Sequence, residues 1–188
     1  MRMTDTTAQT TVPSMRPTSE AARYSTTLEQ YAETVPKATL WASFYFTDED
    51  DQPLQVHSVY SPAYPWQLVG GTMDLGERPW ETAVRECREE TGLTPPGPPR
   101  LLATVFGLPG AEWPYSTIGC VFDGGRLTAE QIRGIALSPQ EHDEVRVLLL
   151  AEWKALMPPR DFARLSAVES ARRTGEAAYF GTWDWGNK

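Results

Sequence analysis

The spacing of apolar and polar residues predicts strands in the first half of the chain. Residues 38–47 are rich in aromatic and β-branched side chains, a composition that is typical of a strand. Residues 54–60 alternate between apolar and polar side chains, which predicts a return strand after an acidic turn. Residues 66–69 predict a short strand that leads into a glycine loop at Gly70 and Gly71.

The next segment has the start and stop signals of a helix. Pro79 suits a first helical turn, and Gly92 suits the left-handed position just past a helix end. About thirteen residues lie between them, which would make roughly 19 Å of helix. On a helical wheel of about 100° per residue, one arc predicts the buried face. The residues of that arc are Trp80, Ala83, Val84, Cys87 and Thr91.

Loops rich in proline and glycine separate the elements after Gly92. The pattern predicts strands at residues 101–106, 115–122 and 145–150, a turn at 123–125, a short helix at 128–135, an amphipathic helix at 161–173, and an aromatic tail at 179–185 that packs on the domain. Strands interleaved with two main helices indicate an α/β fold with a mixed sheet covered on two faces.

The first 35 residues differ from the rest of the chain. Threonine and serine are common there and large apolar side chains are scarce, so we expect residues 1–35 to be a disordered or loosely docked N-terminal segment. Within this segment, Leu28, Tyr31 and Ala32 predict a short docking helix before Pro36. Residues 36–188 then form one domain that includes the C-terminal helix and the aromatic tail.

The composition limits the classes of binding partner and the cell compartment that we expect for this protein. Among 188 residues, 17 are Lys or Arg and 25 are Asp or Glu, and a net charge of −8 argues against binding to nucleic acid polymers or anionic membranes. We interpret Cys87 and Cys120, which lie in apolar surroundings, as buried thiols in a reducing compartment. No apolar stretch approaches the roughly 20 residues that span a bilayer, and no secretory signal is evident. We therefore expect a cytoplasmic protein.

Three glutamates gather on one side of the predicted helix. Glu89 and Glu90 lie three and four positions after Glu86, and like charges at these spacings destabilise a helix unless something neutralises them. A divalent cation is the natural candidate, because carboxylate oxygens are hard ligands that suit Mg²⁺ or Mn²⁺.

The segment that contains these glutamates resembles the signature of the Nudix hydrolase family. That signature is a glycine, five residues, a glutamate, seven residues, Arg-Glu, an apolar residue, any residue, Glu-Glu, any residue, a glycine and an apolar residue. Every fixed position is filled at the right spacing, and cysteine at the first apolar position is a mild departure. The matching residues are Gly71, Glu77, Arg85, Glu86, Cys87, Glu89, Glu90, Gly92 and Leu93.

The resemblance implies a fold, a reaction and a metal site. Nudix hydrolases have an α/β/α sandwich with a mixed central sheet, and they cleave a pyrophosphate bond in a small nucleotide-derived substrate, a nucleoside diphosphate linked to another moiety. Such an enzyme would use Mg²⁺ or Mn²⁺. The metal residues that the resemblance implies are Gly71, through its backbone carbonyl, Glu86, Glu89 and Glu90.

The resemblance also assigns roles beside the metal. Arg85 would orient a signature carboxylate through its planar fork, and Glu77 would brace the glycine loop against the helix. In the family Glu86 is often assigned as the general base, but some members take the base from a loop outside the signature. Glu141 and Glu144 are the loop candidates here. The expected catalytic residues are Glu86, Arg85, Glu89 and Glu141.

Other chemistry-bearing residues have structural interpretations. We expect His142 to be a surface residue and His57, which alternates with apolar neighbours, to be structural. Four aromatic residues have faces on which a base could stack, although packing is the default interpretation for each. These are Tyr60, Tyr64, Trp66 and Trp113.

The signature does not determine the substrate. Pro109 lies sixteen residues past Leu93, a spacing seen in ADP-ribose pyrophosphatases of the family, so ADP-ribose-like compounds are one expectation and nucleoside triphosphates another. An alternative function is a non-catalytic Nudix-fold module that binds a nucleotide-sugar or regulates a partner, although the signature carboxylates are all present. The aromatic tail motivates a homodimer, which would accompany hydrolysis rather than replace it.

Overall fold

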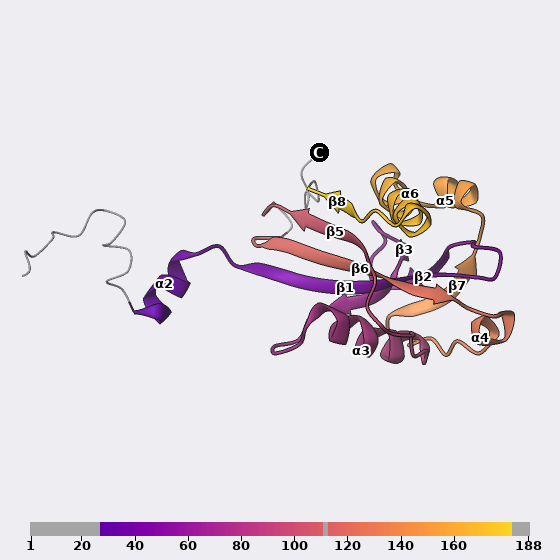
Figure 1. The fold of residues 1–188 in the computed structure, drawn as a ribbon, viewed down its shortest axis with the longest axis horizontal. Coiled ribbons are helices and arrows are strands. Elements are labelled where there is room, and N and C mark those ends of the chain that lie inside the picture. Colours follow the sequence, from indigo (N-terminus) through magenta and orange to yellow (C-terminus); the bar gives the residue numbers. More distant parts are fainter. Residues whose placement is uncertain (1–26, 111–112, 182–188) are drawn as a thin grey trace, which may run out of the picture. The chain divides into compact units, whose positions relative to one another are not determined.

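The computed structural model describes residues 27–110 and 113–181 (Figure 1). The chain divides into two compact units, Met1–Pro36 and Lys37–Lys188. No helix in these described ranges is both long and apolar enough to cross a membrane.

The first unit contains the helix that the sequence predicts before Pro36. Helix α2 (Leu28–Thr34) begins with a capping box, in which the Thr27 hydroxyl accepts the Gln30 amide and the Gln30 side chain accepts the Thr27 amide. The predicted helix is therefore confirmed, whereas its docking stays a prediction. The disorder predicted for most of residues 1–35 falls outside the described residues.

The second unit contains two sheets. The larger is formed by β1 (Ala38–Thr47), β4 (Val69–Thr72), β5 (Leu101–Gly107), β6 (Ser116–Arg126) and β8 (Ala178–Phe180), in the order β4-β1-β6-β5-β8. The smaller has the order β3-β2-β7 and is formed by β2 (Leu54–Ser58), β3 (Trp66–Gln67) and β7 (His142–Val147). Strand β1 is antiparallel to β4 and parallel to β6, so the central sheet is mixed, as predicted.

Helices cover both faces of the larger sheet (Figure 1). One face carries α3 (Pro79–Thr91), with the short α4 (Ala129–Arg133) beyond it, and the other carries α5 (Leu150–Leu156) and α6 (Pro159–Thr174). The predicted α/β/α sandwich is confirmed.

Strand β1 divides the core into two layers. Successive side chains of a strand point to opposite faces, and Phe44 and Phe46 accordingly pack with Cys87 of α3. Between them, Tyr45 faces the other way and packs with Leu165 of α6. The central strand therefore joins the signature helix on one side to the C-terminal helix on the other.

The ends of α3 agree with the sequence prediction. The helix spans Pro79–Thr91, and Gly92 has a left-handed φ of 72° while its amide donates to the Arg88 carbonyl. Ala83, Cys87 and Thr91 are buried as expected, with Trp80 and Val84 half-buried against the same core, but Glu90 is buried as well.

The expected glycine loop is instead a strand. Gly70 and Gly71 belong to β4 and pair with Ser43 and Ala42 of β1. A Cβ at Gly70 would lie 2.2 Å from the Ala42 carbonyl oxygen, so the close approach of β1 requires glycine there.

Two strand boundaries and one helix in the second half also differ from the prediction. Strand β6 continues through the expected turn at 123–125, helped by a bulge opposite β1 and a left-handed Gly125. Strand β7 begins at His142 rather than at residue 145, because it pairs with β2 from Ser58 onward. Helix α5 was not predicted, since its start resembles the end of a strand.

The C-terminal tail contributes an edge strand. Ala178–Phe180 forms β8, which pairs in parallel with β5, so the packing expected of the tail is confirmed for these residues. The remainder of the tail, residues 182–188, lies outside the described residues, and self-association through it stays a prediction.

Candidate active site

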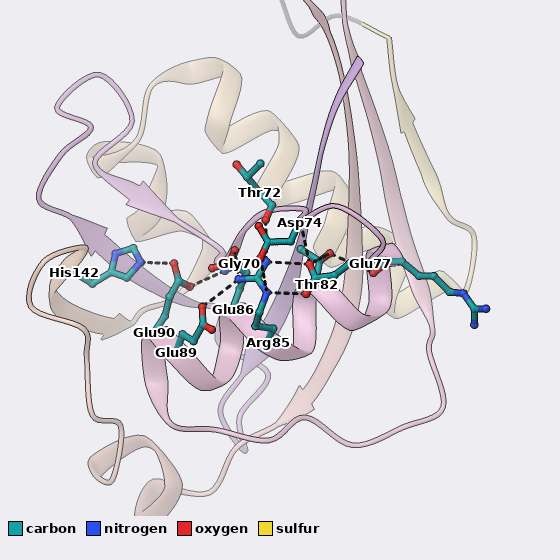
Figure 2. Close-up of polar contacts among 11 residues, drawn as sticks. Gly70, Thr72, Asp74, Glu77, Thr82, Arg85, Glu86, Glu89, Glu90 and His142 are labelled. Atoms are coloured by element: carbon teal, nitrogen blue, oxygen red, sulfur yellow. Dashed lines mark hydrogen bonds and ion pairs between the residues drawn. The ribbon is translucent and has the colours of Figure 1, made fainter. Parts of the chain in front are cut away.

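Arg85 holds three signature carboxylates from the middle of α3 (Figure 2). Its Nε and Nη2 donate to the two oxygens of Glu77 at 2.7 and 3.0 Å, a bidentate pair. Its Nη1 donates to Glu86 at 2.8 Å and to Glu89 at 3.1 Å. Nη2 also donates to the Thr72 carbonyl at 3.0 Å, which ties the helix to β4.

Glu77 braces the segment between β4 and α3. Besides Arg85, its Oε2 accepts the Asp74 amide at 3.0 Å and the Thr82 hydroxyl at 2.8 Å. Arg85 above all, and then the Asp74 amide, lower the pKa of Glu77 to about 2. Glu77 therefore stays ionised across the physiological range, as a fixed partner of Arg85.

Glu86 lies against the backbone of Gly71. A Cβ added at Gly71 would stand 2.5 Å from the Glu86 carboxyl carbon, so only glycine leaves room for this carboxylate. Burial raises the pKa of Glu86, Arg85 opposes the rise, and the charges of Glu90 and Glu89 add to it. Glu86, Glu89 and Glu90, which we call the acidic cluster, thus carry more negative charge than Arg85 alone balances.

Glu90 and His142 form a buried pair at the end of α3 (Figure 2). Oε1 of Glu90 lies 2.8 Å from Nε2 of His142, with side-chain exposures of 3% and 1%. Oε2 of Glu90 accepts the Gly70 amide at 2.7 Å. The expectation that His142 is a surface residue is wrong, because β7 starts earlier than predicted and its first residue is fully buried.

The pair has a defined arrangement of protons. Nδ1 of His142 lies 3.2 Å from the His57 carbonyl, which can only accept, so Nδ1 carries a proton. Burial alone would lower the pKa of His142, but the hydrogen bond and charge of Glu90 raise it. Burial raises the pKa of Glu90 in turn. The hydrogen bond between Nε2 and Oε1 requires a proton on one of these two atoms.

Glu141 lies beside this pair. It directly precedes His142 in the chain, and its backbone carbonyl accepts the Val59 amide at 2.9 Å. Burial is the main cause of the raised pKa of Glu90 and of Tyr60, and the charge of Glu141 adds to both. The structure therefore brings one loop candidate for the base close to the signature residues.

Glu144 is engaged elsewhere. It lies within β7 rather than in the preceding loop, and its two oxygens accept Nε and Nη2 of Arg146 at 2.5 and 2.9 Å. The Arg146 guanidinium in turn lies 4.8 Å over the Trp66 ring.

The carboxylates of the acidic cluster have protein hydrogen-bond partners, namely Arg85 and the Gly70 amide. No group of three or more His, Cys, Asp or Glu side chains in the described ranges is close enough together to hold an ion. The donor set nevertheless fits a hard divalent cation, because every donor is an oxygen and each carboxylate oxygen can accept more than one bond. Glu89, whose side chain is 58% exposed, is the most accessible member.

A cavity of about 560 Å³ adjoins the signature residues, with Gly70, Gly71 and Thr72 in its wall. The four aromatic residues considered for base stacking all line it: Tyr60, Tyr64, Trp66 and Trp113. Trp66 is also buried against Trp153, so for this residue core packing and cavity lining are combined.

One ion pair of α6, between Asp161 and Arg164, lines the same cavity. Oδ2 of Asp161 is buried and has no hydrogen-bond partner among the described residues. Burial lowers the pKa of Arg164 to about 9. The sequence prediction missed this polar wall, because an acid at a helix start is usually explained by the helix dipole.

Comparison with known proteins identifies the family and the fold. The NUDIX domain family matches residues 39–173. Among similar solved structures, the MutT protein from Methanosarcina mazei Go1 is 24% identical with a TM-score of 0.57, covering 75% of this chain and 97% of that one. An Ap4A hydrolase from C. elegans is 20% identical with a TM-score of 0.54, covering 73% and 98%. UDP-X diphosphatase is 19% identical with a TM-score of 0.59, covering 86% and 80%.

The likeness to these structures shows the fold alone. A curated protein, the chromosomal passenger complex protein bir1 of Schizosaccharomyces pombe, is 36% identical over 50 residues, which is 26% of this chain. The chain spans only 5% of the length of that relative, so the match carries no function. The family match covers most of the chain and includes an intact signature. The chain therefore belongs to the NUDIX domain family, and its domain is that of a Nudix hydrolase.

Proposed function

We propose that this Nudix hydrolase cleaves a pyrophosphate bond in a nucleoside diphosphate derivative and depends on Mg²⁺ or Mn²⁺. One observation carries the proposal: Gly71 borders two features at once. Its missing side chain leaves room for the Glu86 carboxylate, and the same residue lines the cavity of about 560 Å³. A diphosphate bound over Gly71 would meet the acidic cluster while its nucleoside entered the cavity.

The cation would be held by the Gly71 carbonyl and by Glu86, Glu89 and Glu90. When bound, it supplies charge neutralisation for the diphosphate and lowers the pKa of water. The chain's own residues orient these ligands: Arg85 holds Glu86 and Glu89, and the Gly70 amide holds Glu90. Burial is the main cause of the raised pKa of Glu86, and the charges of Glu90 and Glu89 add to it, so a cation at this position would relieve the cost of the ionised carboxylate.

Glu141 is the residue that we propose as general base, with Glu86 as the alternative. Glu141 directly precedes His142, whose ring contacts Glu90, and its backbone carbonyl accepts the amide of Val59, the neighbour of the cavity residue Tyr60. General base catalysis is typically worth about 10²–10⁴-fold. Glu144 suits the role less, since Arg146 binds both of its oxygens.

The cavity would receive the nucleoside through stacking on aromatic faces, which tolerates different bases. The Ap4A hydrolase and the UDP-X diphosphatase share this fold under names that give different substrates. The fold therefore leaves ADP-ribose-like compounds and nucleoside triphosphates as candidate substrates. The side chains of the cavity would determine which of them binds.

A substrate panel tests the proposal. ADP-ribose, dinucleoside polyphosphates and oxidised nucleoside triphosphates would each be incubated with the protein and Mg²⁺ or Mn²⁺, and products identified by mass spectrometry. We expect metal-dependent turnover of at least one compound. Glu89→Gln should lower kcat by about 10²-fold or more, because it removes an accessible metal ligand.

Glu81→Gln is the matched control, because Glu81 lies on the same helix in an exposed first turn, and glutamine keeps an acceptor for the Arg78 amide. Its kcat should stay within about twofold of wild type, as for most exposed substitutions. Nucleotide binding with no product under any metal condition would contradict hydrolysis and favour the non-catalytic module.

A further inference from the structure

His142 joins two parts of the molecule that the Nudix signature does not connect. It is the first residue of β7, in the three-stranded sheet, whereas Glu90 lies in the last turn of the helix that packs on β1 and β4 of the larger sheet. The contact between Nε2 and Oε1 is 2.8 Å long and almost fully buried.

Both ring nitrogens of His142 and both oxygens of Glu90 are committed. Nδ1 donates to the His57 carbonyl, which leaves Nε2 for Glu90 and gives the ring one orientation. Oε2 of Glu90 accepts the Gly70 amide. The carboxylate is thus held between one group of β4 and one group of β7.

The chain just before His142 is docked on the same end of α3. The last carbonyls of a helix lack partners within the helix, and here the Ala136 amide donates to the Thr91 carbonyl at 3.1 Å. The Ser138 amide donates to the Glu90 carbonyl at 3.2 Å, and the His142 amide donates to the Ser138 carbonyl at 2.8 Å. Glu141 and His142 therefore follow directly after a segment that is hydrogen-bonded to the end of α3.

We propose that His142 is a positioning residue for the active site: it holds the Glu90 carboxylate in one orientation and sets the place of the adjacent Glu141 against the signature helix. This inference rests on the proposed function for its effect on metal binding and turnover. Its geometric content, the orientation of Glu90, can be measured without metal.

Two substitutions separate the hydrogen bond from the packing. His142→Phe fills the site with a ring that cannot donate, whereas His142→Gln places an amide N–H near the position of Nε2. Because outer hydrogen bonds to metal ligands are typically worth about 10–100-fold, His142→Phe should weaken Mn²⁺ binding in calorimetry by about that factor and lower kcat. His142→Gln should restore most of both.

Asp143→Asn is the matched control. Asp143 is the next residue, and its carboxylate pairs with Nδ1 of His57 in an exposed contact. This variant should keep Mn²⁺ affinity and kcat within about twofold of wild type.

Hydrogen exchange of the Gly70 amide in metal-free protein gives the independent readout, because this amide donates to Glu90. We expect exchange at Gly70 to be at least about tenfold faster in His142→Phe, and close to wild type in His142→Gln and Asp143→Asn. Failure of wild type to bind Mn²⁺ or turn over the panel would overturn the proposed function, while the Gly70 measurement would still decide the positioning role.

Unchanged Gly70 exchange, Mn²⁺ affinity and kcat in His142→Phe would overturn the inference. If His142→Phe does not fold, His142→Gln decides: loss of Gly70 protection and of Mn²⁺ affinity in a folded glutamine variant would equally overturn it.

Discussion

The middle and the C-terminal end of the signature helix hold their carboxylates by different means. In the middle of α3, Arg85 is a permanent cation with 26% of its side chain exposed, and it reaches Glu77, Glu86 and Glu89 at once. At the C-terminal end, the buried His142 contacts one signature carboxylate, that of Glu90. The first arrangement is made within one stretch of sequence, and the second joins residues 52 positions apart.

This difference separates charge balance from orientation. Arg85 neutralises several carboxylates in a partly hydrated setting, where a cation can take over part of its role because Glu89 is open to solvent. His142 and Glu90 are hydrogen-bonded in a dry setting, where a lost partner leaves a buried polar group unsatisfied. We therefore expect Arg85 to govern the electrostatics of the whole cluster and His142 to govern the placement of one ligand.

The largest expected effect follows from removing the shared cation. Arg85→Ala leaves Glu77, Glu86 and Glu89 facing one another without a counter-charge, so kcat/KM should fall by about 10²-fold or more and the Tm should fall as well. Arg85→Lys keeps the charge but loses the planar fork, and its activity should lie between wild type and Arg85→Ala. Steady-state kinetics and thermal unfolding measure both. Wild-type activity in Arg85→Lys would show that charge alone suffices.

A smaller effect is expected from removing one of the repelling charges. The pKa of Glu86 is raised in the folded protein, so the folded state binds more protons there than the unfolded state, and stability falls as pH rises above the ordinary value of 4.5. In metal-free protein at pH 7, Glu86→Gln should therefore raise the Tm. The gain should vanish below about pH 4.

Replacing Glu77 should change the Tm in the opposite direction from replacing Glu86. Arg85 lowers its pKa to about 2, so its contribution to stability is present above the ordinary value of 4.5 and is lost as pH falls towards 2. Glu77→Gln should lower the Tm at pH 7 and approach wild type in acid. Glutamine variants that shift the Tm in the same direction would contradict this assignment of roles along α3.

The smallest expected effect is the energetic coupling between Arg85 in the middle of the helix and His142 at its C-terminal end. Urea unfolding of Arg85→Lys, His142→Phe and the double variant gives a coupling free energy, which should be below about 0.5 kcal/mol if the two arrangements act independently. A value above about 1 kcal/mol would show that Arg85 and His142 belong to one network.

Local sequence predicted most of the elements that carry the site. The ends of α3 follow from Pro79 and Gly92, and β1 follows from its aromatic composition, because each signal lies inside its own element. The strand character of Gly70 and Gly71 could not be predicted, since it depends on pairing with β1. Helix α5 was missed for a related reason: its apolar first residue continues the pattern of the strand before it.

In the candidate site, too, contacts between residues close in sequence were predicted and contacts made by tertiary packing were not. The contacts of Arg85 lie within a short stretch and fit the resemblance, whereas the contact between Glu90 and His142 depends on how the smaller sheet docks at the helix end. A lone histidine in a polar loop carries no local sign of burial. The wall formed by Asp161 was likewise hidden, because only the tertiary fold brings α6 to the cavity.

Strand β8, near the end of the chain, pairs with β5 and contributes Phe180 to the wall of the cavity. Every acidic residue of the signature lies between Glu77 and Glu90, far earlier in the chain, so the proposed metal ligands and this part of the cavity wall come from separate stretches of sequence. Proteolytic trimming before residue 178 would open the cavity and spare the acids. The shape of the cavity therefore depends on the far C-terminal strand, whereas the positions of the acidic residues do not.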